Sequence, residues 1–168
     1  MTGKVHEITF KILPEISDSK SAQYQDEPVI GRSFPVKTYS HSENRVISTK
    51  LHFVVLTHED AYRNMLHLRA IQSASYPREG DRDRPYLPPP ICQIKVGRLL
   101  AADFLCVVLK SYNVSYPIDV VWYDVPEMLN VPGAVSSYIP YKFSIDCTWD
   151  VVYPNERLPG QESILRDF

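Results

Sequence analysis

Hydrophobic and polar residues alternate strictly along three stretches of the chain, and each stretch predicts a β-strand. The clearest covers residues 141–153, where apolar side chains take every odd position and polar ones the even positions from Lys142 to Asp150. Residues 45–56 and 5–13 alternate in the same way. A strand of this kind packs one face on a core and turns the other to water.

A helical period replaces the alternation at residues 58–74, and Thr57 offers an N-cap to the predicted helix. Its apolar arc is Ala61, Met65 and Leu68, flanked by Tyr62, Leu66 and Ile71. That arc is broader than the ~100° stripe of a helix lying on one sheet. Either the helix packs deeply in its own domain, or a neighbouring subunit covers its outer shoulder. Tyr76 before Pro77 predicts the helix end.

Two further strands are predicted at residues 91–96 and 104–116, where apolar side chains are dense. The segment before them begins as a charged loop at 78–84 and continues at 85–90 as PYLPPP. Consecutive prolines favour the extended polyproline conformation. We therefore expect a stiff connector there, although such a segment can also serve as a ligand for a peptide-binding domain.

Two long segments carry neither period. Residues 14–44 are polar and predict an extended arm that is either mobile or ordered by something else. Residues 117–140 are too apolar for an ordinary surface loop and predict an interface loop. We expect one domain over 1–153, a C-terminal tail at 154–168, and an α+β, mainly β fold.

The composition suits a globular protein without a strong charge. The chain has 168 residues, with 18 Lys plus Arg against 20 Asp plus Glu and a formal charge of −2. That balance gives no polybasic field for nucleic acid or acidic lipid. No stretch is apolar enough for a membrane span or a signal peptide. Three widely spaced cysteines, each in register with apolar neighbours, are typical of buried thiols in a reducing cytoplasm.

Motifs for catalysis are missing from the sequence. There is no HExxH, no Cys/His ligand spacing, no GxSxG elbow, no Walker loop and no GxGxxG. Asp146 and Asp150 share a strand face but would lie ~13 Å apart, beyond the ~6.5–9.5 Å of an inverting glycosidase pair. We therefore expect no enzyme activity, no metal and no cofactor; a hydrolase with an unfamiliar site is the remaining enzymatic alternative.

The order of the motifs is more specific than any one of them. IGRSFP at 30–35 and KTY at 37–39 precede the strand and capped helix, and Tyr76-Pro77 follows the helix. PPP at 88–90 then leads into the last three strands. Over roughly residues 8–153 this succession resembles the tail-tube-like proteins at the baseplate of contractile phage tails, namely the hub and tube-initiator subunits.

The resemblance implies a β-sandwich or small barrel with one flanking helix, repeated around a ring that is usually a hexamer. The expected partners are other copies of the chain and the baseplate, tail-tube and tape-measure proteins, with DNA only in transit and no membrane. The protein would be part of the virion and assembled in the host cytoplasm. No LysM segment accompanies the motifs, and they do not separate a hub, tube initiator, adaptor or terminator.

The resemblance and the apolar loop together suggest an interface formed by several residues. These are Ile30, Gly31, Arg32, Pro35, Tyr39, Trp122, Met128 and Leu129. Asp146 and Asp150 would line the ring's channel and keep it from binding a passing polyanion, or they simply face bulk solvent. We expect that deleting 15–27 leaves a folded monomer that forms no rings. A peptide- or carbohydrate-binding β-module, using PYLPPP or the 117–140 patch, is the alternative function.

Overall fold

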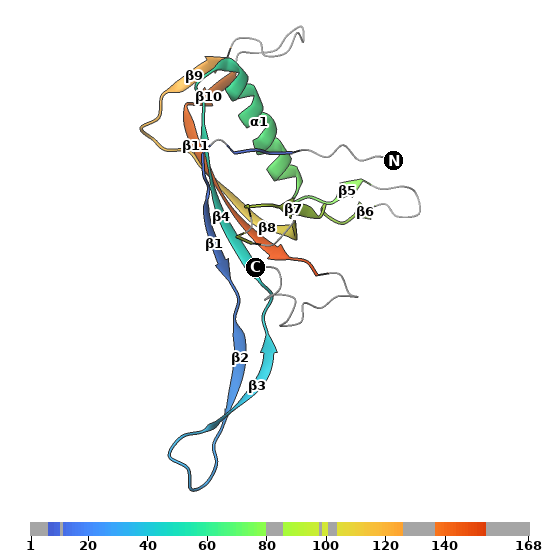
Figure 1. Cartoon of the computed structure of the whole chain (residues 1–168). Coiled ribbons are helices and arrows are strands. Elements are labelled where there is room, and N and C mark those ends of the chain that lie inside the picture. Colours follow the sequence, from blue (N-terminus) through green and yellow to red (C-terminus); the bar gives the residue numbers. More distant parts are fainter. Residues whose placement is uncertain are drawn as a thin grey trace.

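The computed structural model describes residues 7–10, 12–79, 86–97, 99–100, 104–125 and 137–153 (Figure 1). It confirms the mainly β, α+β class with a flanking helix. Five antiparallel strands in the order β1-β4-β11-β8-β7 form one sheet that curls into a half-barrel. Their bounds are β1 Glu15–Ser19, β4 Val46–Val54, β7 Cys92–Ile94, β8 Leu105–Ser115 and β11 Lys142–Val151.

Three two-stranded ribbons and the helix complete the described fold. The ribbons are β2 Ala22–Glu27 with β3 Val36–Ser42, β5 Arg78–Glu79 with β6 Tyr86–Leu87, and β9 Trp122–Val125 with β10 Ser137–Pro140. The helix α1 spans His58–Ser73. Figure 1 shows the β2–β3 hairpin extending away from one end of the sheet, with β9 and β10 at the opposite end.

The core lies on one face of the central strands, as the alternation predicts. Every second residue is buried along β4 and β11. The buried residues of these two strands and β8 include Ile47, Leu51, Phe53, Leu105, Val107, Leu109, Phe143, Ile145, Cys147, Trp149 and Val151. A β-bulge opposite Thr148 and Trp149 shifts the register of β8. Because a bulge reverses which residues face inward, the core side of β8 passes from Leu109 to Tyr112.

The helix begins where the capping pattern predicts, because Thr57 Oγ1 accepts a hydrogen bond of 3.1 Å from the Asp60 backbone N–H. Its buried face is narrower than the apolar arc, since Tyr62 and Leu66 are 40% and 41% exposed. The expectation that this side of the helix packs deeply within its own domain is therefore wrong. The buried stripe instead takes in Asn64, which donates to the Val54 carbonyl at 3.0 Å.

Two strand predictions at the N-terminal side need correction. The described part of 5–13 forms no strand, because β1 already occupies the free edge of β4; Phe10 packs edge-on against Phe53 instead, with ring centroids 5.8 Å apart. The 14–44 arm, for which no strand is predicted, contains β1, β2 and β3. Alternation reveals a strand only when one face is buried, and the residues of β2 are exposed on both faces.

The two proline-rich and apolar connections also contain strands. Arg78 and Glu79 pair with Leu87 and Tyr86, so the predicted charged loop and the predicted stiff connector each contribute one strand to a short ladder. Within 117–140, β9 pairs with β10 in a second small sheet. Residues 126–136 lie outside the described part of that segment. The predicted strands 91–96 and 104–116 are confirmed as β7 and β8.

Candidate assembly surfaces

The β2–β3 hairpin is a ribbon that projects from the sheet into solvent (Figure 1). All six residues of β2 are exposed, and in β3 only Val36 is half-buried. An isolated two-stranded hairpin is marginally stable in water, because neither of its faces is covered. The side chains of this ribbon therefore add little to the core of their own chain and are available to another surface.

The tip of the hairpin is apolar and tightly turned. Ile30 is fully exposed and Phe34 is 71% exposed. The Arg32 backbone N–H donates to the Val29 carbonyl at 3.2 Å, and Gly31 has a φ of +87°. That conformation disfavours any residue with a Cβ atom, so Gly31 serves the turn. Two large apolar side chains are thus presented at the end of an arm.

A pair of tyrosines marks one face of the ribbon. Tyr24 and Tyr39 are directly opposite each other, and their rings meet edge to face with centroids 5.8 Å apart. Each remains more than half exposed. The Tyr39 hydroxyl lies 2.8 Å from Ser42 Oγ. Aromatic side chains that stay exposed beside a polar partner are typical of interface residues.

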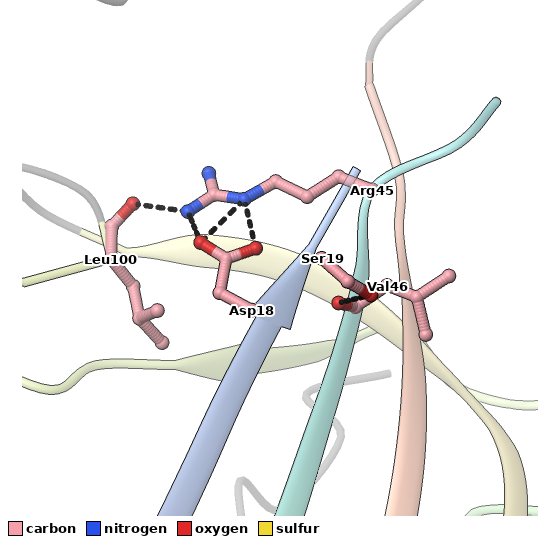
Figure 2. A network of polar contacts seen from close by, with 5 residues as sticks. All are labelled: Asp18, Ser19, Arg45, Val46 and Leu100. Atoms are coloured by element: carbon pink, nitrogen blue, oxygen red, sulfur yellow. Dashed lines mark hydrogen bonds and ion pairs between the residues drawn. The ribbon is translucent and has the colours of Figure 1, made fainter. Parts of the chain in front are cut away.

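An ion pair lies at the end of the sheet where the hairpin begins, between Asp18 of β1 and Arg45 just before β4 (Figure 2). Arg45 Nε donates to Asp18 Oδ1 at 2.9 Å and to Oδ2 at 3.1 Å, and Nη2 donates to the same carboxylate. Nη2 also donates to the Leu100 carbonyl at 3.3 Å. Ser19 Oγ donates to the Val46 carbonyl at 3.3 Å. Bidentate arginine–carboxylate pairs fix geometry as well as charge.

Further hydrogen bonds surround this pair. Gln23 Nε2 donates to Glu43 Oε1 at 2.8 Å, and the Ser21 hydroxyl donates to the other oxygen of that carboxylate. Asn44 Nδ2 donates to the Val151 carbonyl at 3.0 Å. The Arg45 hydrogen bond lowers the pKa of Asp18, and the hydrogen bonds from Ser21 and Gln23 lower the pKa of Glu43. Both carboxylates are therefore held in their charged form.

Exposed aromatic residues also gather at the opposite end of the sheet. Trp122 is 51% exposed, and its ring centroid lies 6.2 Å from that of Tyr116. The Tyr141 N–H donates to the Val121 carbonyl at 2.9 Å, which ties β9 to the start of β11. The exposed apolar residues here are Leu56, Tyr116, Ile118, Val121, Trp122, Tyr138 and Tyr141. They form a second surface, separate from the hairpin.

The predicted interface residues fall into two groups. The structure brings Ile30, Gly31, Arg32, Pro35 and Tyr39 together on the hairpin, and it places Trp122 at the far end of the sheet. Met128 and Leu129 lie outside the described residues.

Sequence reasoning missed several residues of these surfaces. Phe34 stands inside the IGRSFP motif, and Tyr24 is an isolated aromatic in a polar stretch, so both carried a signal. Asp18 and Arg45 did not, because they are 27 positions apart and meet only through the pairing of β1 with β4.

The polar face of the sheet carries Asp146 and Asp150. Asp146 is in register between Lys50 on β4 and Asn113 on β8, and Asp150 Oδ2 lies 3.7 Å from Lys110 Nζ. A neighbouring row consists of hydroxyl residues from four strands, Ser17, Ser48, Thr148 and Ser111. Each carboxylate thus has a lysine nearby, and the face is mixed in charge rather than uniformly acidic.

Burial affects the reactivity of two of the cysteines. The three cysteines are free thiols. Burial raises the pKa of Cys147 to about 12, and it also raises the pKa of Cys92. A thiol with a raised pKa is a poor nucleophile at neutral pH.

A hollow between α1 and β4 is lined partly by His52, whose Nε2 lies 3.4 Å from Glu15 Oε1.

Within the ranges that the structure describes, no group of three or more His, Cys, Asp or Glu side chains could hold a metal ion. The one helix in those ranges falls short of the length and apolar character needed to cross a membrane. Comparison with known proteins finds no family model that matches the sequence and no similar protein among curated sequences.

Proposed function

We propose that this chain is a structural subunit of a contractile phage tail, a baseplate hub or tube-initiator protein that forms a ring with copies of itself. The observation that carries the proposal is the β2–β3 hairpin, an ordered arm with an apolar tip that its own chain leaves exposed. The motif order supports the tail assignment, and one of its pieces, IGRSFP at 30–35, lies at the tip of this arm.

The edges of the main sheet support self-association. Among the described strands, β1 pairs only with β4, and β7 pairs only with β8, so each has one unpaired edge. An open edge is a template for a strand from another molecule. A ring in which the β1 edge of one copy meets a neighbour would use this edge, and the hairpin would extend the contact beyond the sheet.

The polar face of the sheet suits a wet channel. Its hydroxyl row and its lysine-matched carboxylates offer no concentrated positive charge for a polyanion to bind. In the proposed ring, Asp146 and Asp150 line the channel through which the tape-measure protein and then DNA pass. A ring whose channel wall excludes both carboxylates would overturn this part of the proposal.

The sharpest test removes the arm and keeps the sheet. Deleting 15–27 is unsuitable, because it would also remove β1 from the sheet edge. Replacing 22–42 with Asn-Gly is better, since the Glu43 N–H already donates to the Ser21 carbonyl at 2.9 Å, the arrangement that closes a two-residue hairpin turn. The matched control is the paired variant Ile30→Ser, Phe34→Ser, which changes only the tip.

We expect the natural chain to form closed rings, and the truncated chain to remain a folded monomer in sedimentation velocity and electron microscopy. The tip variant should fold normally and associate weakly. Rings that persist without the arm would assign assembly to another surface. A natural chain that stays monomeric at every concentration would overturn the proposal and favour the peptide- or carbohydrate-binding module.

A further inference from the structure

The ladder between the hairpin and the sheet is interrupted at an uneven junction. Ser19 pairs with Val46, and the next pair is Ala22 with Ser42. Two residues on one strand, 20–21, therefore face three on the other, 43–45. An unequal count bends a ribbon and removes ladder hydrogen bonds locally. A ribbon joined to its sheet through such a gap alone would pivot.

Side chains bridge this gap from both strands. Arg45 joins its own strand to Asp18 on β1 and to the Leu100 carbonyl before β8 (Figure 2). Glu43 accepts from the Ser21 and Gln23 side chains across the ribbon. The backbone of Arg45 also accepts from the Val151 N–H of β11 at 3.0 Å. The junction is thus connected to β1, to the segment that precedes β8, and to β11.

We propose that the Asp18–Arg45 pair is a positioning device that holds the β2–β3 hairpin in one direction relative to the sheet. The role in assembly rests on the proposed function, in which the hairpin meets a second copy of the chain. An arm that is already directed loses less conformational freedom on binding than a pivoting one. The pair therefore strengthens association without touching the partner.

The degree of exposure separates this pair from an ordinary surface ion pair. The Arg45 side chain is only 22% exposed and makes three hydrogen bonds to one carboxylate, from two of its nitrogen atoms. Lys37 and Asp26, within the hairpin, are 70% and 56% exposed and lie 3.7 Å apart. Exposed pairs of that kind contribute little, so Asp26→Asn is a matched control: it also removes one aspartate charge from an ion pair, but within the hairpin and away from the junction.

The test measures the direction of the arm itself. Spin labels on genetically encoded ketone residues at Gln25 and Gln93 leave the native cysteines untouched. With the labelled chain diluted in unlabelled chain, double electron–electron resonance gives the distance between the two labels of one chain. We expect one narrow distance distribution in the natural chain and in Asp26→Asn. Asp18→Asn and Arg45→Gln should broaden it and weaken self-association about tenfold, which equals about 1.4 kcal/mol.

Arg45→Lys controls for loss of folding, because it keeps the cation but cannot form the bidentate pair. It should broaden the distance distribution while the tryptophan fluorescence of the chain stays native. Unchanged narrow distributions in the junction variants would overturn the inference, as would equal broadening in Asp26→Asn or a broad distribution in the natural chain. A natural chain that never self-associates would overturn the proposed function alone, since the distances in that monomer still decide the role of the pair.

Discussion

Two cross-strand aromatic pairs show how differently this chain uses the same ladder. In the sheet, Phe53 of β4 lies opposite Phe143 of β11, with stacked rings 4.9 Å apart and both side chains buried. In the hairpin, Tyr24 lies opposite Tyr39 with rings 5.8 Å apart and both side chains exposed. Backbone pairing is alike in the two places. The difference is burial: the pair in the sheet is covered by the core and stabilises the chain, whereas the pair in the hairpin stays exposed to solvent.

The neighbouring strands follow the same division. Along β11 every second residue is buried, whereas no residue of β2 is. Burial of apolar area is the main source of folding free energy. The sheet should therefore determine the stability of the monomer, and the hairpin should determine what the monomer binds. The predictions below test that division, beginning with the largest effect.

Truncating one ring of each aromatic pair gives the most direct comparison. Phe143→Ala should lower the free energy of unfolding by about 3–5 kcal/mol, because it opens a cavity in the core. Tyr39→Ala should lower it by less than about 1 kcal/mol, the range of an exposed cross-strand pair. Urea unfolding followed by fluorescence measures both. Similar losses would show that the hairpin belongs to the cooperative core.

A buried hydrogen bond gives the second comparison. Trp149 Nε1 donates to Thr49 Oγ1 at 2.9 Å inside the sheet. Thr49→Val keeps the shape but leaves the indole N–H without its partner, so the free energy of unfolding should fall by about 1–3 kcal/mol. Thr49→Ser retains the hydroxyl and is the control. In the hairpin, Ser42→Ala removes the exposed partner of Tyr39 and should change stability by under about 0.5 kcal/mol. A larger loss there than at Thr49 would contradict the division.

The smallest effect concerns the junction between the two regions. The pKa of Asp18 is lowered from 3.8, mainly by its hydrogen bond with Arg45, with Tyr153 among the groups that raise the Arg45 pKa. A lowered folded-state pKa contributes stability that is complete above pH 3.8 and is lost as the pH falls through the folded-state value.

Urea unfolding at several pH values should therefore show the natural chain more stable than Asp18→Asn at neutral pH, with the difference vanishing in acid. For this partly exposed pair we expect less than about 1 kcal/mol at neutral pH. A difference that persists unchanged below the folded-state pKa would assign the effect of Asp18→Asn to shape rather than charge. Asp26→Asn again serves as the control, because the ion pair it removes lies in the hairpin and away from the junction.

Much of the fold was predictable from residues whose burial leaves a periodic trace. The odd positions of β11 and β4, the Thr57 cap and the helix that follows are all where the pattern predicts. In each case a single local rule suffices, because alternation or helical spacing reflects one buried face. The hairpin motif 30–35 was also visible, although only as a motif and not as the turn of a ribbon.

The errors arise where no buried face exists or where distant segments compete. Residues 14–44 hid three strands, because β2 and β3 are exposed on both faces. Residues 5–13 alternate like a strand, but the edge of β4 is already paired with β1. Tyr62 and Leu66 looked like core residues and are exposed, while the polar Asn64 is buried against β4.

The sequence by itself determined the central strands, the capped helix and the weak overall charge, because those depend on the spacing of residues close together in the chain. Only the tertiary structure decided that the polar arm contains a β-hairpin and that Asp18 meets Arg45 where this hairpin leaves the sheet. Those features depend on which strand pairs with which, and in what register. Pairing brings together residues whose separation in sequence leaves no local trace.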